Sequence, residues 1–270
     1  MSRLGSIVMH HRVHSPRYSE LLREAGLEES WVPQAPEDLS SLPIIDKEFL
    51  RAARFNECPG TDEPVTLVST SGTTSAAAEI PHNESSLRAG LGENFARALV
   101  LGNLTPDRWC LIGHWDPAST ERNVQVTGSF LSMAWLHDKL DGTPLLRNGA
   151  TGMEQLADEV GEYRPDAIAS SPNLLAALAR TLLGNGDHLR LEGLLYGGAS
   201  ANDEHRKLWH EVFAPAKIVA FYPTTDAGAI GVSPKDNGRY LTFSETHLVE
   251  VVGCDGRHVK EGHRGRLGLC

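Results

Sequence analysis

Short apolar runs alternate along this chain with segments whose apolar residues recur at helical spacing. Between residues 109 and 223 the segments WCLIGHW, DAIASS, LEGLLYGG and KIVAFYP predict buried strands, and GMEQLADEVGEY, NLLAALARTLL and NDEHRKLWHEVF predict amphipathic helices between them. This regular alternation is typical of a parallel α/β sheet with helices against its faces. We therefore predict an α/β fold of layered mixed or parallel sheets with flanking helices.

The two ends of the chain follow other patterns. Near the N-terminus, PRYSELLREA has helical spacing, and PIIDKEFLRAA offers Asp46 as the N-cap of a second short helix. After Pro223 the sequence becomes strand-like and punctuated by glycine. We expect a helical lead-in at 1–60, an α/β core at 61–222 and a β-rich C-terminal subdomain at 223–270.

Composition narrows the class of protein. The chain has 270 residues, 40% of them hydrophobic, and can bury a substantial core. Its formal net charge of -10 disfavours binding to nucleic acid. The sequence contains neither a secretory signal nor an apolar stretch of membrane-spanning length, and its four cysteines lack C-x-x-C spacing. We expect a cytoplasmic protein that binds neither nucleic acid nor membrane.

The stretch STSGTTS at 69–75 places hydroxyl groups and one glycine after a predicted strand and before a predicted crossover helix. Its hydroxyl and amide groups suit phosphate oxygens, and Gly72 permits close approach of the backbone. The G-x-x-x-x-G-K pattern of a P-loop is missing. From the residues alone, a phosphate site and a solvated Ser/Thr turn both remain open.

STSGTTS resembles the phosphate loop of the adenylate-forming superfamily, which includes acyl-CoA synthetases and peptide-synthetase adenylation domains. Three more stretches follow the family's order, namely SLPIIDKEFLR, LYGGAS at 195–200 and FYPTTDAG at 221–228. YSELLREAGL, LPIIDKEFLR and DAIASSPNLLAALAR are similar to the phenylacetate-CoA ligase-like branch. The resemblance spans nearly the whole chain and implies the large N-terminal domain of an adenylate-forming enzyme, with the mobile C-terminal domain absent.

The resemblance implies that ATP activates a carboxylic acid as its acyl-AMP, with Mg²⁺ as the metal and pyrophosphate as the product. Transfer to the thiol of coenzyme A, or to the phosphopantetheine arm of a carrier protein, would follow in a complete enzyme. Two alternatives remain open: a non-catalytic acyl- or nucleotide-binding module, or split enzyme, that lacks the C-terminal domain, and an acyl-protein synthetase in which Cys270 receives the acyl group. The acid, the acceptor and a homodimeric state are left open.

Functional roles carry over to the residues that match the family's motifs. The implied catalytic residues are Thr225, which contacts the α-phosphate, and Asp226, which binds Mg²⁺. Tyr222 would stack on adenine. Asp226 stands where the family usually has glutamate, and Ser75 where glycine is common. The other implied nucleotide-binding residues are Ser71, Gly72, Thr73, Thr74, Ser75, Gly197, Gly198 and Ala199, and the substrate-pocket candidates are His114, Asn173 and Phe221.

Each of these assignments has a structural alternative. Tyr222 would equally fill a core, Asp226 or Asn173 would cap a helix, and His114 would be a buried core histidine. Gly197 and Gly198 would form an ordinary turn after a strand.

Overall fold

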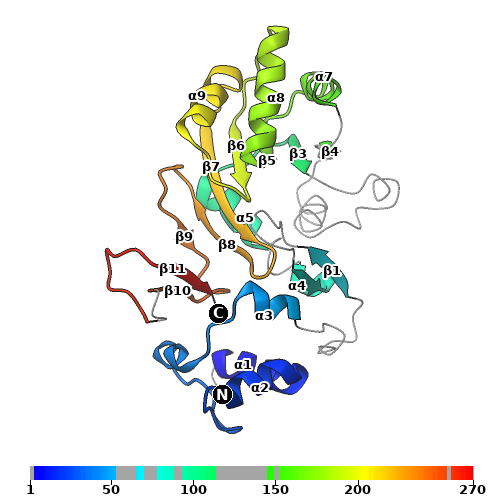
Figure 1. Ribbon diagram of the computed structural model, residues 1–270. Coiled ribbons are helices and arrows are strands. Elements are labelled where there is room, and N and C mark those ends of the chain that lie inside the picture. The colour runs from blue at the N-terminus through cyan, green and yellow to red at the C-terminus, as the bar shows by residue number, and fades with distance from the viewer. Residues whose placement is uncertain are drawn as a thin grey trace. The chain divides into compact units, whose positions relative to one another are not determined.

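A computed structural model describes the chain at residues 3–52, 65–69, 78–87, 93–113, 145–148, 152–253 and 257–269 (Figure 1). Residue contacts divide the chain into two compact units. Unit 1 consists of Met1–Glu84 together with Ser244–Cys270, and unit 2 is Ser85–Phe243. Unit 1 is therefore built from both ends of the chain, whereas unit 2 is one continuous stretch.

The N-terminal part of unit 1 is helical. It contains α1 (Arg3–His14), α2 (Pro16–Glu24), the 3-10 helix η1 (Pro36–Ser41) and α3 (Lys47–Ala52). The two predicted helices are confirmed as α2 and α3. Asp46 caps α3 as expected, because its Oδ1 accepts a hydrogen bond from the backbone N–H of Phe49 at 2.9 Å. Helix α1 was not predicted, since its pattern buries no more than Gly5 and Val8.

Two antiparallel hairpins complete the described part of unit 1. Strand β1 (Thr66–Ser69) pairs with β2 (Glu79–His82), and β10 (Val249–Val252) pairs with β11 (Arg266–Leu269). The expectation that the hydroxyl-rich loop leads straight into a crossover helix is wrong, because the chain first enters β2. That strand is four residues long and contains Pro81, so it carries little strand signal. Helices α4 (Glu84–Leu87) and α5 (Asn94–Gly102) follow.

Unit 2 is built on a mixed sheet whose strands lie in the order β4-β3-β5-β6-β7-β8-β9. The first five strands are mutually parallel, and β8 and β9 extend the sheet in antiparallel fashion. The strands are β3 (Trp109–Gly113), β4 (Leu145–Asn148), β5 (Ala167–Ser170), β6 (Gly193–Gly197), β7 (Lys217–Thr224), β8 (Gly228–Ser233) and β9 (Leu241–Thr242).

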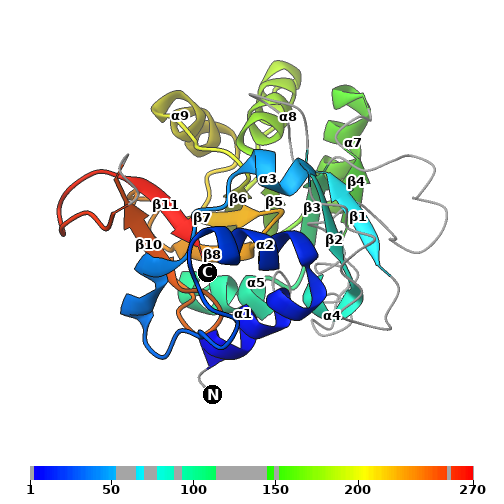
Figure 2. The same cartoon turned by 60° about the horizontal axis from the view of Figure 1, so that its bottom comes forward.

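Helices cover both faces of this sheet. Figure 2 shows α7 (Met153–Tyr163), α8 (Pro172–Asn185) and α9 (Asp203–Val212) along one side and α5 on the other. Successive strand residues alternate between the two cores: Leu194 packs among the residues of α7, α8 and α9, and Leu195 packs with those of α5. Because both faces are buried, the strands read as continuous apolar runs, which confirms the predicted α/β fold.

The division between the units differs from the predicted boundary at residue 223. Strand β7 continues to Thr224, and β8 and β9 belong to the same sheet. The glycines in this stretch form a turn and a close strand contact within that sheet. Gly228 has a φ of +74° at the hairpin end, and a Cβ on Gly231 would lie 2.6 Å from the carbonyl oxygen of Leu241. Within the described ranges, no helix combines the length and the apolar character needed to cross a membrane.

Candidate active site

The carboxyl ends of the parallel strands lie at one edge of the unit 2 sheet. Strand β5 ends at Ser170, β6 at Gly197 and β7 at Thr224. Ligands of open α/β sheets bind at this edge, because the loops that leave it are free to diverge. Those sequence-predicted site residues that are described all lie at or just beyond this edge, namely Asn173, Gly197, Gly198, Ala199, Phe221, Tyr222, Thr225 and Asp226.

A tight hairpin turn joins β7 to β8 and presents Asp226. Thr224 pairs with Gly228 across a three-residue turn, and the N–H of Ala227 donates to Thr224 Oγ1 at 3.1 Å. The positive φ of Gly228 closes this turn, as in hairpins that end on a left-handed residue. The side chain of Asp226 is exposed. A helix-capping role for it is wrong, because the turn that contains it joins two strands and precedes no helix.

Tyr222 and Phe221 point to opposite faces of β7. Phe221 is partly buried against the core on the α5 side of the sheet. Tyr222 is 42% exposed, which rules out the alternative that it fills a core. Its ring lies beside that of Tyr240, which is also 42% exposed, at a centroid distance of 5.7 Å and an interplanar angle of 52°. The exposed ring of Tyr222 is thus available for a planar ligand.

Glycine is favoured at positions 197 and 198, at the end of β6, for two different physical reasons. A Cβ on Gly197 would lie 2.8 Å from the carbonyl oxygen of Phe221 and 3.1 Å from Pro223 Cδ. The close approach of β7 therefore requires glycine at position 197. Gly198 has a φ of +79°, a left-handed conformation that favours glycine. The position where a Cβ would be is open space, so there is room next to its backbone.

The pocket candidate Asn173 lies on α8, the helix that follows β5. Its predicted alternative as a helix cap is wrong, because Ser171 is the N-cap of α8 and its side chain accepts from the N–H of Leu174. Asn173 is exposed on the first turn of α8. Ser170 is buried, and its hydroxyl donates to the carbonyl oxygen of Ile112 on β3 at 2.7 Å. This hydrogen bond joins the carboxyl ends of the neighbouring strands β3 and β5.

Several predicted residues lie outside the described part of the chain. They are Ser71, Gly72, Thr73, Thr74, Ser75, His114 and Cys270. Among the described residues, no group of three or more His, Cys, Asp or Glu side chains could hold a metal ion. Mg²⁺ needs no such cage, since it is usually held by one or two carboxylates, water and the phosphates of a nucleotide. The exposed carboxylate of Asp226 fits that mode of binding.

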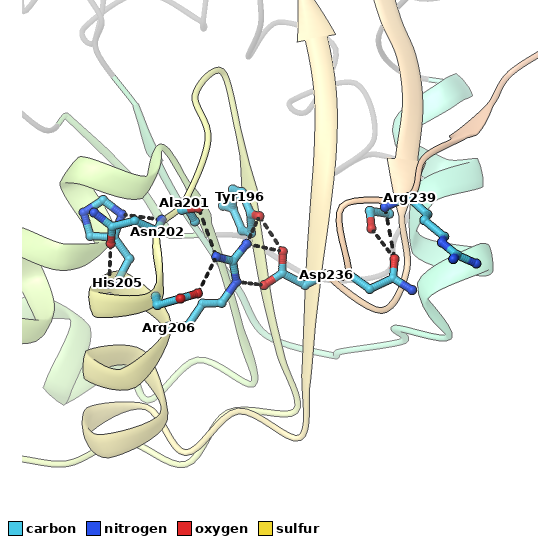
Figure 3. Close-up of polar contacts among 10 residues, drawn as sticks. Tyr196, Ala201, Asn202, His205, Arg206, Asp236 and Arg239 are labelled. Atoms are coloured by element: carbon cyan, nitrogen blue, oxygen red, sulfur yellow. Dashed lines mark hydrogen bonds and ion pairs between the residues drawn. The ribbon is translucent and has the colours of Figure 1, made fainter. Parts of the chain in front are cut away.

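Sequence reasoning missed a partly buried polar cluster beside the end of β6 (Figure 3). Arg206 on α9 donates from Nε to Asp236 Oδ2 at 2.6 Å and from Nη2 to Asp236 Oδ1 at 3.0 Å. The hydroxyl of Tyr196, on β6, donates to Asp236 Oδ1 at 2.5 Å and accepts from Arg206 Nη2 at 3.2 Å. Arg206 Nη1 also donates to the carbonyl oxygen of Ala201 at 3.0 Å. These contacts join β6, the loop after Gly198, α9 and the β8–β9 turn.

Burial and charge explain the electrostatics of this cluster. Tyr196 is 3% exposed, and burial followed by its hydrogen bond to Asp236 raises the pKa of its hydroxyl. The hydrogen bond that Arg206 donates to the Asp236 carboxylate is the main cause of a raised pKa for Arg206. A bidentate guanidinium–carboxylate pair of this kind is geometrically specific. The sequence shows the turn, as Asp-Asn-Gly at 236–238, but local spacing does not reveal a partner 30 positions away.

Comparison with known proteins supports the fold. No protein-family model and no curated protein matches the sequence. A crystal structure of 2-hydroxyisobutyryl-CoA ligase in an open conformation, in complex with 2-HIB-AMP and CoA, is 19% identical, with a TM-score of 0.81 over 99% of this chain and 63% of that one. The same ligase in its thioesterification state gives 18% identity and a TM-score of 0.79 over 99% of this chain and 58% of that one.

A more distant structure agrees. A long-chain-fatty-acid-CoA ligase from Archaeoglobus fulgidus is 15% identical, with a TM-score of 0.53 over 76% of this chain and 41% of that one. The chain thus spans less than two thirds of the length of each of these ligases. From this agreement over almost all of its residues, we conclude that the chain has the fold of the adenylate-forming ligases.

Proposed function

We propose that this chain activates a carboxylic acid with ATP, forming an acyl-AMP and pyrophosphate. One observation carries the proposal: the turn after β6 and the hairpin after β7 are neighbours at the carboxyl edge of the sheet, since Gly197 pairs with Phe221. Those two segments hold the LYGGAS and FYPTTDAG motifs. The likeness in fold to a ligase whose structure contains 2-HIB-AMP also supports the proposed formation of an acyl-AMP.

In this proposal the adenine base lies between the two segments. The exposed ring of Tyr222 offers a face for stacking, and the open space at Gly198 allows the base to approach the backbone. Ala199 follows in the same turn. The hydroxyl-rich residues from Ser71 to Ser75 are proposed to bind phosphate oxygens, on the basis of the sequence motif.

The proposed reaction is an in-line displacement at phosphorus. One carboxylate oxygen of the acid attacks the α-phosphorus of ATP, the bond to the bridging oxygen breaks, and pyrophosphate leaves with the electron pair. Thr225 would donate its hydroxyl to an α-phosphate oxygen, and Asp226 would hold Mg²⁺, which neutralises charge on the phosphate oxygens when bound. Holding two anions in reactive geometry supplies most of the catalysis in such a step.

The acid is proposed to bind where β3 and β5 end. The sheet order β4-β3-β5 means that the chain leaves β3 to one side and later returns to the other, and such switch points bind ligands. In the sequence His114 comes directly after β3, and Asn173 comes three positions after the end of β5. Transfer of the acyl group to coenzyme A or a carrier-protein thiol remains part of the proposal for the whole protein.

Exchange of labelled pyrophosphate into ATP, in the presence of candidate acids, tests the reaction. We expect acid-dependent exchange by the wild-type chain and a loss of about 100-fold or more in Asp226→Asn, which removes the metal-binding charge without changing side-chain size. Asp226→Glu should keep much of the exchange, because glutamate preserves the carboxylate. Asp187→Asn, an exposed aspartate after α8, is the matched control.

Calorimetry with Mg-ATP separates binding from turnover. Equal exchange by wild type and Asp226→Asn would contradict the assigned role of Asp226. Binding of ATP without exchange, with any of the acids, would favour a non-catalytic nucleotide-binding module.

A further inference from the structure

The aromatic pair Tyr222 and Tyr240 has a specific origin in the sheet. Tyr222 is paired in register with Gly231 on β8, and Gly231 is paired with Thr242 on β9. Side chains at paired positions, and at positions two apart on one strand, lie on the same face of a sheet, so Tyr240 shares a face with Tyr222. The centroids of the two rings lie 5.7 Å apart on that face. Gly231 is required nearby for another reason, since a Cβ there would press on the backbone of Leu241.

The turn that carries Tyr240 is held firmly from outside its own hairpin. The bidentate contact of Asp236 with Arg206 ties the turn to α9, and the hydroxyl of Tyr196 ties it to β6. The side chain of Asp236 is 8% exposed and that of Arg206 is 28% exposed, so this ion pair is partly shielded from solvent. Such a partly shielded, bidentate pair holds its partners more rigidly than a surface ion pair does.

Within the turn, Asn237 adds a local brace. Its Oδ1 accepts from the backbone N–H of Arg239 at 3.1 Å and from the hydroxyl of Ser233 at 3.4 Å (Figure 3). Asp236 and Gly238 both have positive φ, so the backbone in this turn takes a defined left-handed path. Tyr240 therefore leaves the turn in a direction set by α9, β6 and the turn itself.

From this arrangement we infer that Tyr240 forms, together with Tyr222, a two-ring binding surface for the purine base of the nucleotide, and that the Arg206–Asp236 pair positions Tyr240 for that contact. The inference rests on the proposed function and adds to it a base-selecting residue and the device that places it. Both residues are 42% exposed, and in this inference a planar base covers part of that exposed surface.

The ionisation of Tyr240 suits this role. Burial, and after it the charge of Asp236, raises the pKa of the Tyr240 hydroxyl. The phenol is therefore neutral at physiological pH and does not repel a nucleotide. A competing explanation is that the pair only stabilises the sheet, as cross-strand aromatic pairs do. The experiment must distinguish base selection from sheet stability.

Calorimetric titration of the 270-residue chain with AMP and with CMP provides the test. We expect wild type to prefer AMP, and Tyr240→Leu to weaken AMP binding by about 3- to 10-fold, the range that a lost aromatic contact gives, while CMP binding changes less. Tyr240→Phe should retain the preference. Leu241→Ala is the matched control, since Leu241 is the exposed neighbour on the same strand and has no ring.

A double variant tests the positioning role. If Asp236 acts through Tyr240, Asp236→Asn will reduce the preference for AMP in wild type and will have no further effect on it in Tyr240→Leu. A purely structural role would lower the melting temperature and would leave the AMP-to-CMP ratio unchanged. Additive effects of the two substitutions on that ratio would overturn the positioning role.

The outcomes separate this inference from the proposed function. Failure of wild type to bind AMP would reject both. AMP binding that is unchanged in Tyr240→Leu, or weakened equally for AMP and CMP, would reject the two-ring surface alone and leave acid activation standing.

A second measurement covers the case in which a variant does not fold. With 3-fluorotyrosine incorporated at position 240 of the wild-type chain, AMP should shift its fluorine resonance, and ribose 5-phosphate should not, because the shift comes from the ring of the base. Equal shifts, or no shift with AMP, would reject contact between Tyr240 and the base.

Discussion

At the scale of single residues, the site depends on places where a side chain is missing. Gly197 lets β7 approach β6, Gly198 supplies a left-handed turn with open space beside it, and Gly231 lets β9 approach β8. The sequence motif LYGGAS contains Gly197 and Gly198 but does not indicate that the two glycines have different roles. Their different roles follow from the neighbouring strand, which a local pattern does not describe.

Substitution of Gly197 tests the close approach of the two strands. We expect Gly197→Ala to reduce the free energy of unfolding by about 1–3 kcal/mol, because its Cβ would press on the backbone of β7 and not on a flexible side chain. Gly184→Ala is the matched control. Gly184 lies in α8 with open space around it, and alanine there should leave stability unchanged or raise it by up to about 1 kcal/mol. Chemical denaturation of both variants measures the difference, and equal stabilities would contradict the packing argument.

At the scale of elements, the sequence predicts what local physics determines. Strands β3, β5, β6 and β7 and helices α7, α8 and α9 appear where apolar runs and helical spacing placed them. The elements that were missed are those with weak local patterns: α1, the short strand β2 with its proline, and β4, which is four residues long. Register and long-range pairing, including the contact of Arg206 with Asp236, depend on the folded sheet and have no local signature.

The 3-10 helix η1 gives a pH-dependent prediction at this scale. The backbone N–H groups of Gln34 and Ala35 donate to the Asp38 carboxylate and hold its pKa below the ordinary value of 3.8. A lowered pKa in the folded state adds stability above pH 3.8, and this stability is lost as pH falls through the lowered pKa. We therefore expect Asp38→Asn to be less stable than wild type at pH 7 and the gap to close below about pH 4.

Thermal melting of wild type and Asp38→Asn between pH 3 and pH 7 checks this expectation. Glu37→Gln, an exposed neighbour in the same helix, is the control for a general effect of removing a negative charge. A gap that stays constant over the whole range would show that the ionised carboxylate contributes nothing to η1.

At the scale of the whole molecule, the residues that carry the proposed base site all belong to unit 2. Gly197, Tyr222 and Tyr240 lie within 85–243, together with both cores of the sheet and the Arg206–Asp236 pair. The hydroxyl-rich sequence at 69–75 belongs to Met1–Glu84, the N-terminal stretch of unit 1. Under the proposed function, recognition of the base and of the terminal phosphates is therefore encoded in separate parts of the sequence.

This separation predicts the behaviour of a fragment. We expect residues 85–243 to fold cooperatively by themselves, since the apolar side chains on both faces of the sheet are buried by helices of the same unit. If the base site is correctly assigned, the fragment will also prefer AMP over CMP. Circular dichroism during thermal melting and calorimetry measure the two properties. A fragment without a cooperative transition would show that the sheet depends on unit 1.

The make-up of unit 1 from both ends of the chain has a consequence for biosynthesis. The guanidinium of Arg3 donates to the carbonyl oxygen of Glu245 at 2.9 Å, so the opening helix is joined to a segment that the ribosome produces much later. Arg3 and Glu245 are 242 positions apart, and at common translation speeds the residues between them take about 10–50 s to emerge. The nascent opening helices must stay soluble and unpaired with that segment throughout this delay, while the sheet behind them has time to assemble first.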